Sequence, residues 1–171
     1  MKKYEEFKDA IGQRESGNNY QIINTLGFLG RFQFGKPRLY DLGFSIDGYC
    51  PKGLAPKRII TKEQFLNDPA LQDQLFDKHV VLLAKAIRNK YSEGVKKYSL
   101  SGLIAGAHLK GLGGVRGFLN GNDNADAYGT KISEYINKFK DYDIPGYESS
   151  VRDVAISEEN IPKPKPVEKI I

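Results

Sequence analysis

The sequence predicts a mainly helical fold with a small region of strands and loops after the first helix. The clearest evidence is a run of apolar residues at helical spacing from Leu71 to about Tyr91. Two helix-start signals precede it. Thr61-Lys62-Glu63-Gln64 has the pattern of a capping box, and Asp68-Pro69 that of an N-cap followed by proline at the first helical position. In contrast, residues 16–35 are rich in glycine and asparagine, which favours turns or short strands.

The other elements of the first half follow in chain order. A helix is expected over residues 3–15, where apolar side chains share one face, and Gly17 suits the left-handed position after its last turn. Pro37 predicts the start of a short helix. Residues 44–60 contain two glycines and two prolines and are predicted to form a surface loop.

The second half of the chain predicts two further helices. One is expected to be capped by Ser101 and to continue through Ala107 until glycines break it, with a short helical piece near Phe118. The other spans Ile132 to Phe139, whose apolar residues recur at helical spacing. The glycines expected to break the first of these helices are Gly111, Gly113 and Gly114.

Length and composition predict one domain over residues 1–147 and an extended Pro/Lys-rich tail or linker over residues 148–171. A single cysteine, Cys50, excludes an internal disulfide. The N-terminus lacks the apolar core of a signal peptide, and no apolar run is long enough for stable membrane insertion. The net charge of +5 attracts polyanions such as nucleic acid, anionic membranes or wall polymers, without choosing among them.

Glu15 is the first candidate for chemistry. A carboxylate in the last turn of a helix faces the negative end of the helix dipole, and apolar neighbours would also disfavour its charged form. Phe28, Phe32 and Phe34 are candidates for such an apolar wall. A raised pKa would let Glu15 act as the general acid on a glycosidic oxygen. The alternative is an ordinary solvated charge.

The spacing around Glu15 resembles the first motif of the lytic transglycosylases. That motif has Glu-Ser, a variable stretch and Gly-Ala-x-Gly-Leu-Met-Gln, with the glutamine eighteen residues after the glutamate. Here Glu15-Ser16, Gly27, Gly30 and Gln33 follow this pattern, since 33 − 15 = 18. The glycines would let the loop backbone approach a sugar ring closely.

Two later segments resemble the family's other motifs, in the same order, so that the resemblance covers roughly residues 4–140. The segment 107–115, AHLKGLGGV, resembles Ala-Tyr-Asn-Ala-Gly and its glycine-rich turn, and Tyr135 resembles the tyrosine on a late helix. The departures bear on the substrate more than on the fold and are typical of a divergent or phage-type member. They are His108 for tyrosine, Leu109 for asparagine, Phe28 for alanine, and Arg31-Phe32 for Leu-Met.

The resemblance implies a lysozyme-like α+β fold and cleavage of the β-1,4 bond between N-acetylmuramic acid and N-acetylglucosamine in peptidoglycan. It implies Glu15 as catalytic acid and base. The residues that it implies for substrate binding are Ser16, Gln33, Phe34, His108 and Tyr135. Three of these have alternatives: the Gln33 amide could be satisfied by local backbone, His108 could pack instead of lining a cleft, and Tyr135 could be a core tyrosine.

The resemblance leaves the reaction type open between a lytic transglycosylase, which forms 1,6-anhydro ends, and a lysozyme, which uses water and usually a second acid. Three aspartates are available for that role, and none has a spacing that singles it out: Asp41, Asp47 and Asp123. His79, His108 and Cys50 have no metal-ligand spacing, so no metal or cofactor is expected.

Two other classes of function stay open on the sequence. A wall-binding or structural module could keep the fold without turnover. A nucleic-acid-binding domain fits less well because no recognised motif is present and the charge is modest, so no nucleic-acid partner is expected. We expect a monomer that acts on glycan strands in the periplasm or cell wall. Without a signal peptide, phage delivery, specialised secretion or origin in a longer chain would explain that location.

Overall fold

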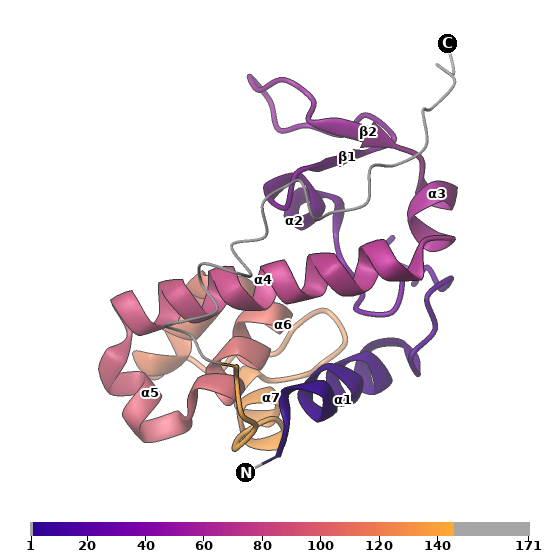
Figure 1. The fold of residues 1–171 in the computed structure, drawn as a ribbon. Coiled ribbons are helices and arrows are strands. Elements are labelled where there is room, and N and C mark those ends of the chain that lie inside the picture. The colour runs from indigo at the N-terminus through magenta and orange to yellow at the C-terminus, as the bar shows by residue number, and fades with distance from the viewer. Residues whose placement is uncertain (1, 146–171) are drawn as a thin grey trace. The chain divides into compact units, whose positions relative to one another are not determined.

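The computed structural model describes residues 2–145, and the predicted tail at 148–171 lies outside them (Figure 1). Within the described residues, seven helices and one two-stranded sheet are present, which confirms a mainly helical protein. None of these helices is both long and apolar enough to cross a membrane. The helices are α1 (Tyr4–Ser16), α2 (Lys36–Asp41), α3 (Lys62–Leu66), α4 (Pro69–Lys90), α5 (Ser92–Tyr98), α6 (Leu100–Leu119) and α7 (Ile132–Lys138). The strands are β1 (Phe44–Ile46) and β2 (Arg58–Ile60).

The described chain divides into two compact units. The first contains residues 2–11 and 80–145, and the second contains residues 12–79. The boundaries fall inside α1 and α4, so each of these helices contributes residues to both units.

The first unit is built on the packing of α6 against α7. Gly102 on α6 permits this close approach, because a Cβ atom there would lie 2.8 Å from the backbone oxygen of Ile136. Phe139 follows α7 and is fully buried, and its ring meets that of Phe7 edge to face with centroids 6.4 Å apart. Gly111 (φ 71°, ψ 176°) interrupts α6, so the helix break predicted there is confirmed.

The start of α6 differs from the prediction. The side-chain cap is Ser99, whose Oγ accepts a hydrogen bond from the Gly102 N–H at 3.2 Å. Ser101 is instead buried inside the helix and donates to the Phe139 carbonyl at 2.7 Å. The assignment of Ser101 as the cap was therefore wrong: its hydroxyl links two elements of the core.

The second unit confirms the predicted helix starts. The Thr61 hydroxyl accepts a hydrogen bond from the Gln64 N–H at 3.0 Å, and the Gln64 side chain accepts one from the Thr61 N–H at 2.9 Å, which completes the capping box of α3. The Asp68 carboxylate accepts from the Leu71 N–H at 3.0 Å at the start of α4. The short helix predicted at Pro37 is α2.

Residues 44–60 do not form a continuous surface loop, so that prediction was wrong at both ends of the segment. β1 and β2 pair in parallel, with Phe44 opposite Arg58, and all three residues of β1 are buried. The glycines and prolines lie between the two strands, where the chain does form a loop. Ser16 ends α1, and the rest of the segment 16–35 forms turns with isolated bridges, as predicted.

Candidate active site

Glu15 is half-buried in the last turn of α1, and the helix ends directly after it. Gly17 and Asn18 both have left-handed backbone angles (φ 63° and 59°). Their N–H groups donate to the carbonyl oxygens of Gln13 and Gly12, each at 3.0 Å. The predicted helix end at Gly17 is therefore confirmed, and it turns the chain sharply beside the candidate acid.

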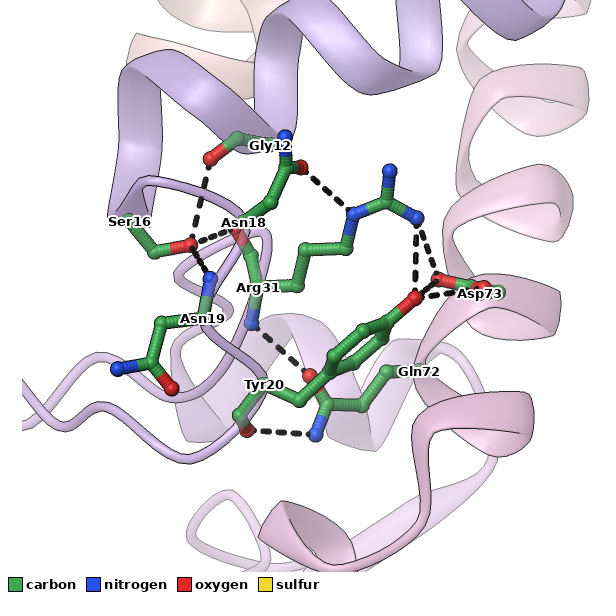
Figure 2. Close-up of polar contacts among 8 residues, drawn as sticks. All are labelled: Gly12, Ser16, Asn18, Asn19, Tyr20, Arg31, Gln72 and Asp73. Atoms are coloured by element: carbon green, nitrogen blue, oxygen red, sulfur yellow. Dashed lines mark hydrogen bonds and ion pairs between the residues drawn. The ribbon is translucent and has the colours of Figure 1, made fainter.

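Ser16 joins the end of α1 to the loop that carries the second half of the motif (Figure 2). Its hydroxyl donates to the Arg31 carbonyl at 2.7 Å and accepts from the Asn19 N–H at 3.0 Å. The Gly12 carbonyl lies 3.2 Å from the same oxygen. A hydroxyl has one proton to donate, and Ser16 gives it to a backbone carbonyl of the loop. The Ser16 side chain therefore holds the loop against the end of α1.

The Arg31 side chain lies at the centre of a polar network in the second unit (Figure 2). Its Nε donates to the Asn18 side-chain oxygen at 2.8 Å, and its Nη1 forms an ion pair with Asp73 at 2.9 Å and lies 3.2 Å from the Tyr20 hydroxyl. Burial alone would lower the pKa of Arg31, but the hydrogen bond and charge of Asp73 outweigh it and raise the pKa. The permanently charged guanidinium of Arg31 thus fixes the loop to the start of α4.

Gln72 holds the same loop through its backbone. The side chain is 1% exposed, accepts from the Arg31 N–H at 2.9 Å, and donates to the Tyr20 and Phe65 carbonyls at 2.9 and 3.0 Å. Gly30 lies against the Gln72 side chain, and a Cβ atom at Gly30 would come within 2.2 Å of the Gln72 side-chain oxygen. This motif glycine therefore makes room for Gln72.

A second close approach involves Gly12 on α1. A Cβ atom at this position would lie 2.1 Å from the Asn18 side-chain oxygen and 2.9 Å from Nε of Arg31. A glycine inside a helix lowers stability by about 1 kcal/mol relative to alanine. At this helix end the missing side chain is what allows Asn18 and Arg31 to meet.

Sequence reasoning missed this network. In the sequence, Arg31 stands out only as a departure from the Leu-Met pair of the family motif, and no pattern marks Gln72. The available signal was a cation placed between Gly30 and Phe32 in an otherwise uncharged segment over residues 16–30, which needs a carboxylate partner if it is buried.

Gln33 and Phe34 occupy different environments in the same unit. Gln33 is half-buried with φ 54°, and its amide donates to the Gly30 carbonyl at 3.1 Å, which matches the alternative of a locally satisfied amide. Phe34 is 2% exposed and meets His79 edge to face at 5.2 Å. Phe32 stacks on Phe76 at 4.1 Å. The two phenylalanines at 32 and 34 therefore form part of the core of the second unit.

The remaining two candidates lie in the first unit. His108 is half-buried on α6, three residues before the interruption at Gly111. Tyr135 is 2% exposed on α7, and its ring lies 5.3 Å from that of Phe139. The second unit thus holds Glu15, Ser16, Gln33 and Phe34, while the other two candidates belong to a separate compact unit.

Each aspartate considered as a second acid has a local partner. Asp41 forms an ion pair with Arg38 at 3.7 Å, and Asp47 accepts from the N–H of the first α3 residue at 3.1 Å. Asp123 accepts from both the N–H and the hydroxyl of Ser133 near the start of α7. These two hydrogen bonds, the side-chain one first, lower the pKa of Asp123.

A buried histidine in the second unit also has a defined partner. His79 is 3% exposed, and its Nδ1 accepts a hydrogen bond from Nε of Arg38 at 2.8 Å. Burial lowers the pKa of Arg38, and Asp41 offsets part of that effect. Among residues 2–145, no three His, Cys, Asp or Glu side chains are grouped as a metal site requires.

Comparison of the chain with family models, with curated proteins and with solved structures gave no match.

Proposed function

We propose that this protein cleaves peptidoglycan glycan strands at the bond between N-acetylmuramic acid and N-acetylglucosamine, with Glu15 as general acid and base on a lysozyme-like fold. The observation that carries the proposal is the 2.7 Å hydrogen bond from the Ser16 hydroxyl to the Arg31 carbonyl. It connects the Glu-Ser pair with the glycine-rich loop that contains Gln33. These are the two halves of the motif on which the resemblance rests.

The polar network supports the same proposal because it fixes the loop that Ser16, the neighbour of the half-buried Glu15, contacts. A general acid must be held at hydrogen-bond distance from the oxygen it protonates, and the loop beside Glu15 is anchored by charged and backbone contacts to α4. Arg31 and Gln72 are positioning residues in this scheme. They act through the loop and not on the substrate.

In the proposed reaction, the Glu15 carboxyl gives its proton to the linking oxygen as the bond from the anomeric carbon to that oxygen breaks. The oxygen of the substrate's own N-acetyl group bonds to the anomeric carbon and stabilises the positive charge. The Glu15 carboxylate then takes the proton of the 6-hydroxyl, whose oxygen replaces the N-acetyl oxygen and closes a 1,6-anhydro ring. This route needs no second carboxylate, which agrees with the structural contacts of Asp41, Asp47 and Asp123.

The test compares release of soluble fragments from purified peptidoglycan by the wild type, Glu15→Gln and Glu5→Gln. Glu5 lies on the same helix and is exposed, so it serves as the matched control. We expect Glu15→Gln to lose at least about 10²-fold in rate, the usual contribution of a general acid, while Glu5→Gln keeps wild-type activity. Mass analysis of the products distinguishes anhydro ends from reducing ends, which carry one more water.

Two results would contradict the proposal. Equal activity of all three proteins would show that Glu15 is not the catalyst. If wild type and Glu15→Gln both bind the wall and neither releases fragments, the protein is a non-catalytic wall-binding module with the same fold.

A further inference from the structure

The segment from Gly48 to Lys62 combines positive charge with exposed apolar side chains. We call these residues the basic segment. It contains four cations and no acidic residue: Lys52, Lys57, Arg58 and Lys62. Three ion pairs of the second unit lie elsewhere, between Arg31 and Asp73, Lys36 and Asp47, and Arg38 and Asp41. Within residues 2–145, no carboxylate pairs with a cation of the basic segment.

Buried hydroxyl groups fix the shape of this segment. The Ser45 hydroxyl, fully buried in β1, accepts from the Lys57 N–H at 2.8 Å. The Tyr40 hydroxyl on α2 donates to the Ala55 carbonyl at 2.9 Å. The Leu54 N–H closes a turn onto the Pro51 carbonyl at 3.1 Å. The loop therefore presents its side chains in a defined arrangement set by the core of the unit.

The exposed apolar side chains of the segment lie among its cations. Leu54 is 57% exposed between Lys52 and Lys57, and Ile59 on β2 is 47% exposed beside Arg58. Figure 1 shows the connection between β1 and β2 extending beyond both strands. An anionic polymer in water would pair with the lysines but would not use Leu54. A bilayer surface offers phosphate groups for the lysines and an apolar interior for the leucine.

The loop at residues 22–28 provides a contrast within the same unit. It also exposes apolar residues, and Leu26 there is 57% exposed, the same fraction as Leu54. However, residues 16–30 contain no charged side chain. An exposed leucine and cations without a carboxylate partner thus coincide in the basic segment and not in this loop.

We propose that the basic segment binds anionic phospholipid at a bilayer surface, with Lys52 and Lys57 contacting lipid phosphates and Leu54 entering the interfacial region. This is peripheral binding by one leucine and a few cations. It does not depend on Glu15 or on wall cleavage.

The experiment is co-sedimentation of the full chain with vesicles of equal parts phosphatidylglycerol and phosphatidylcholine, and with vesicles of phosphatidylcholine alone. At about 0.1 M salt, where the screening length is roughly 10 Å, the wild type should bind the first and not the second. Lys52→Glu/Lys57→Glu should weaken binding by about tenfold or more, since each basic residue near the surface contributes about a fivefold gain. Leu54→Ser should weaken it several-fold.

Two matched controls make the test specific. Lys96→Glu/Lys97→Glu changes the net charge equally at an exposed site in α5, where Lys96 pairs with Glu93. Leu26→Ser removes an equally exposed leucine from the uncharged loop. Both control variants should bind the anionic vesicles within about twofold of the wild type. Far-UV circular dichroism checks that all variants are folded. The contact with Ser45 is made by the Lys57 backbone. The Lys57 ammonium lies 4.3 Å from the centroid of the Tyr40 ring, so the check of folding applies above all to the Lys52→Glu/Lys57→Glu variant.

Three results would overturn the proposal. The wild type could fail to bind anionic vesicles. The two double-lysine variants could lose binding equally, which would make net charge the cause. Vesicle binding could depend on the lysines but not on Leu54, and soluble polyglutamate could bind equally well. The segment would then be a binding site for polyanions in general. Peptidoglycan cleavage measured on the same variants reports separately on the proposed activity.

Discussion

Replacing Gln72 by methionine tests how much the polar network stabilises the second unit. Methionine has nearly the same size and flexibility, so the change removes hydrogen bonds with little change in volume. Gln74, two residues later on α4, is the matched control. Its side-chain oxygen is buried and has no hydrogen-bond partner.

The magnitude follows from the three hydrogen bonds of Gln72. The Phe65 carbonyl keeps the Asp68 N–H as a partner at 3.2 Å, so its loss is modest. The Arg31 N–H and the Tyr20 carbonyl lose the side-chain partner that Gln72 supplies. At about 1 kcal/mol for each of the bonds to Arg31 and Tyr20, and less for the bond to Phe65, Gln72→Met should lower the free energy of unfolding by about 2–3 kcal/mol.

Gln74→Met removes a buried oxygen that has no partner, so we expect it to be neutral or to stabilise by up to about 1 kcal/mol. Urea denaturation followed by far-UV circular dichroism measures both variants by linear extrapolation. If the two substitutions change stability equally, the hydrogen bonds of Gln72 contribute nothing specific and the reasoning fails.

Three further predictions concern packing and pH. Gly102→Ala should destabilise by about 1–3 kcal/mol because the added Cβ meets a backbone oxygen of α7. Gly113→Ala on α6 has open space around the added Cβ and should stabilise by about 0.5–1 kcal/mol. The melting temperatures of the two variants should shift in opposite directions. The pKa of Asp123 is lowered, so its contribution to stability is present above about pH 4 and is lost as the pH falls through the lowered value; Asp123→Asn should flatten stability in that range, and an unchanged acid profile would contradict this. Burial, and then the hydrogen bond to Asp73, raise the pKa of Tyr20. Its contribution to stability is therefore present below about pH 10 and is lost as the pH rises. Tyr20→Phe should flatten the alkaline part of the profile of urea stability against pH, and a profile like that of the wild type would refute this.

Helix ends were predictable from sequence because capping depends on residues only a few positions apart. Thr61 and Gln64 form a reciprocal pair within one turn, and Asp68 caps the N–H of Leu71. Gly17 has the left-handed angles that its position required. Each of these signals lies within four residues of its effect, so no tertiary information was needed.

The elements that sequence missed depend on tertiary contacts or lack a pattern. β1 and β2 have three residues each, too few to show alternation, and their pairing joins segments on either side of a loop. α5 buries none of its residues, so it has no apolar stripe to recognise. Ser99 caps α6 with φ 68°, an angle unusual for a serine, so the sequence favours Ser101 instead.

Sequence spacing nominates residues for the candidate site, but it does not reveal how they are connected. Glu15, Ser16 and Gln33 were identified by spacing and lie in one compact unit. The contact from Ser16 crosses fifteen residues, and that from Arg31 to Gln72 crosses forty-one. No local pattern encodes such pairs, so the network that fixes the loop could be found only from the fold.

The contact among Gly12, Asn18 and Arg31 also offers a way to recognise relatives of this chain. Any side chain at position 12 displaces the amide at 18 and leaves the arginine without its Nε partner. The three positions should therefore change together when divergent sequences are aligned. A glycine, an amide and an arginine at intervals of six and thirteen residues form a search pattern that depends on the shape of one helix end and not on Glu15.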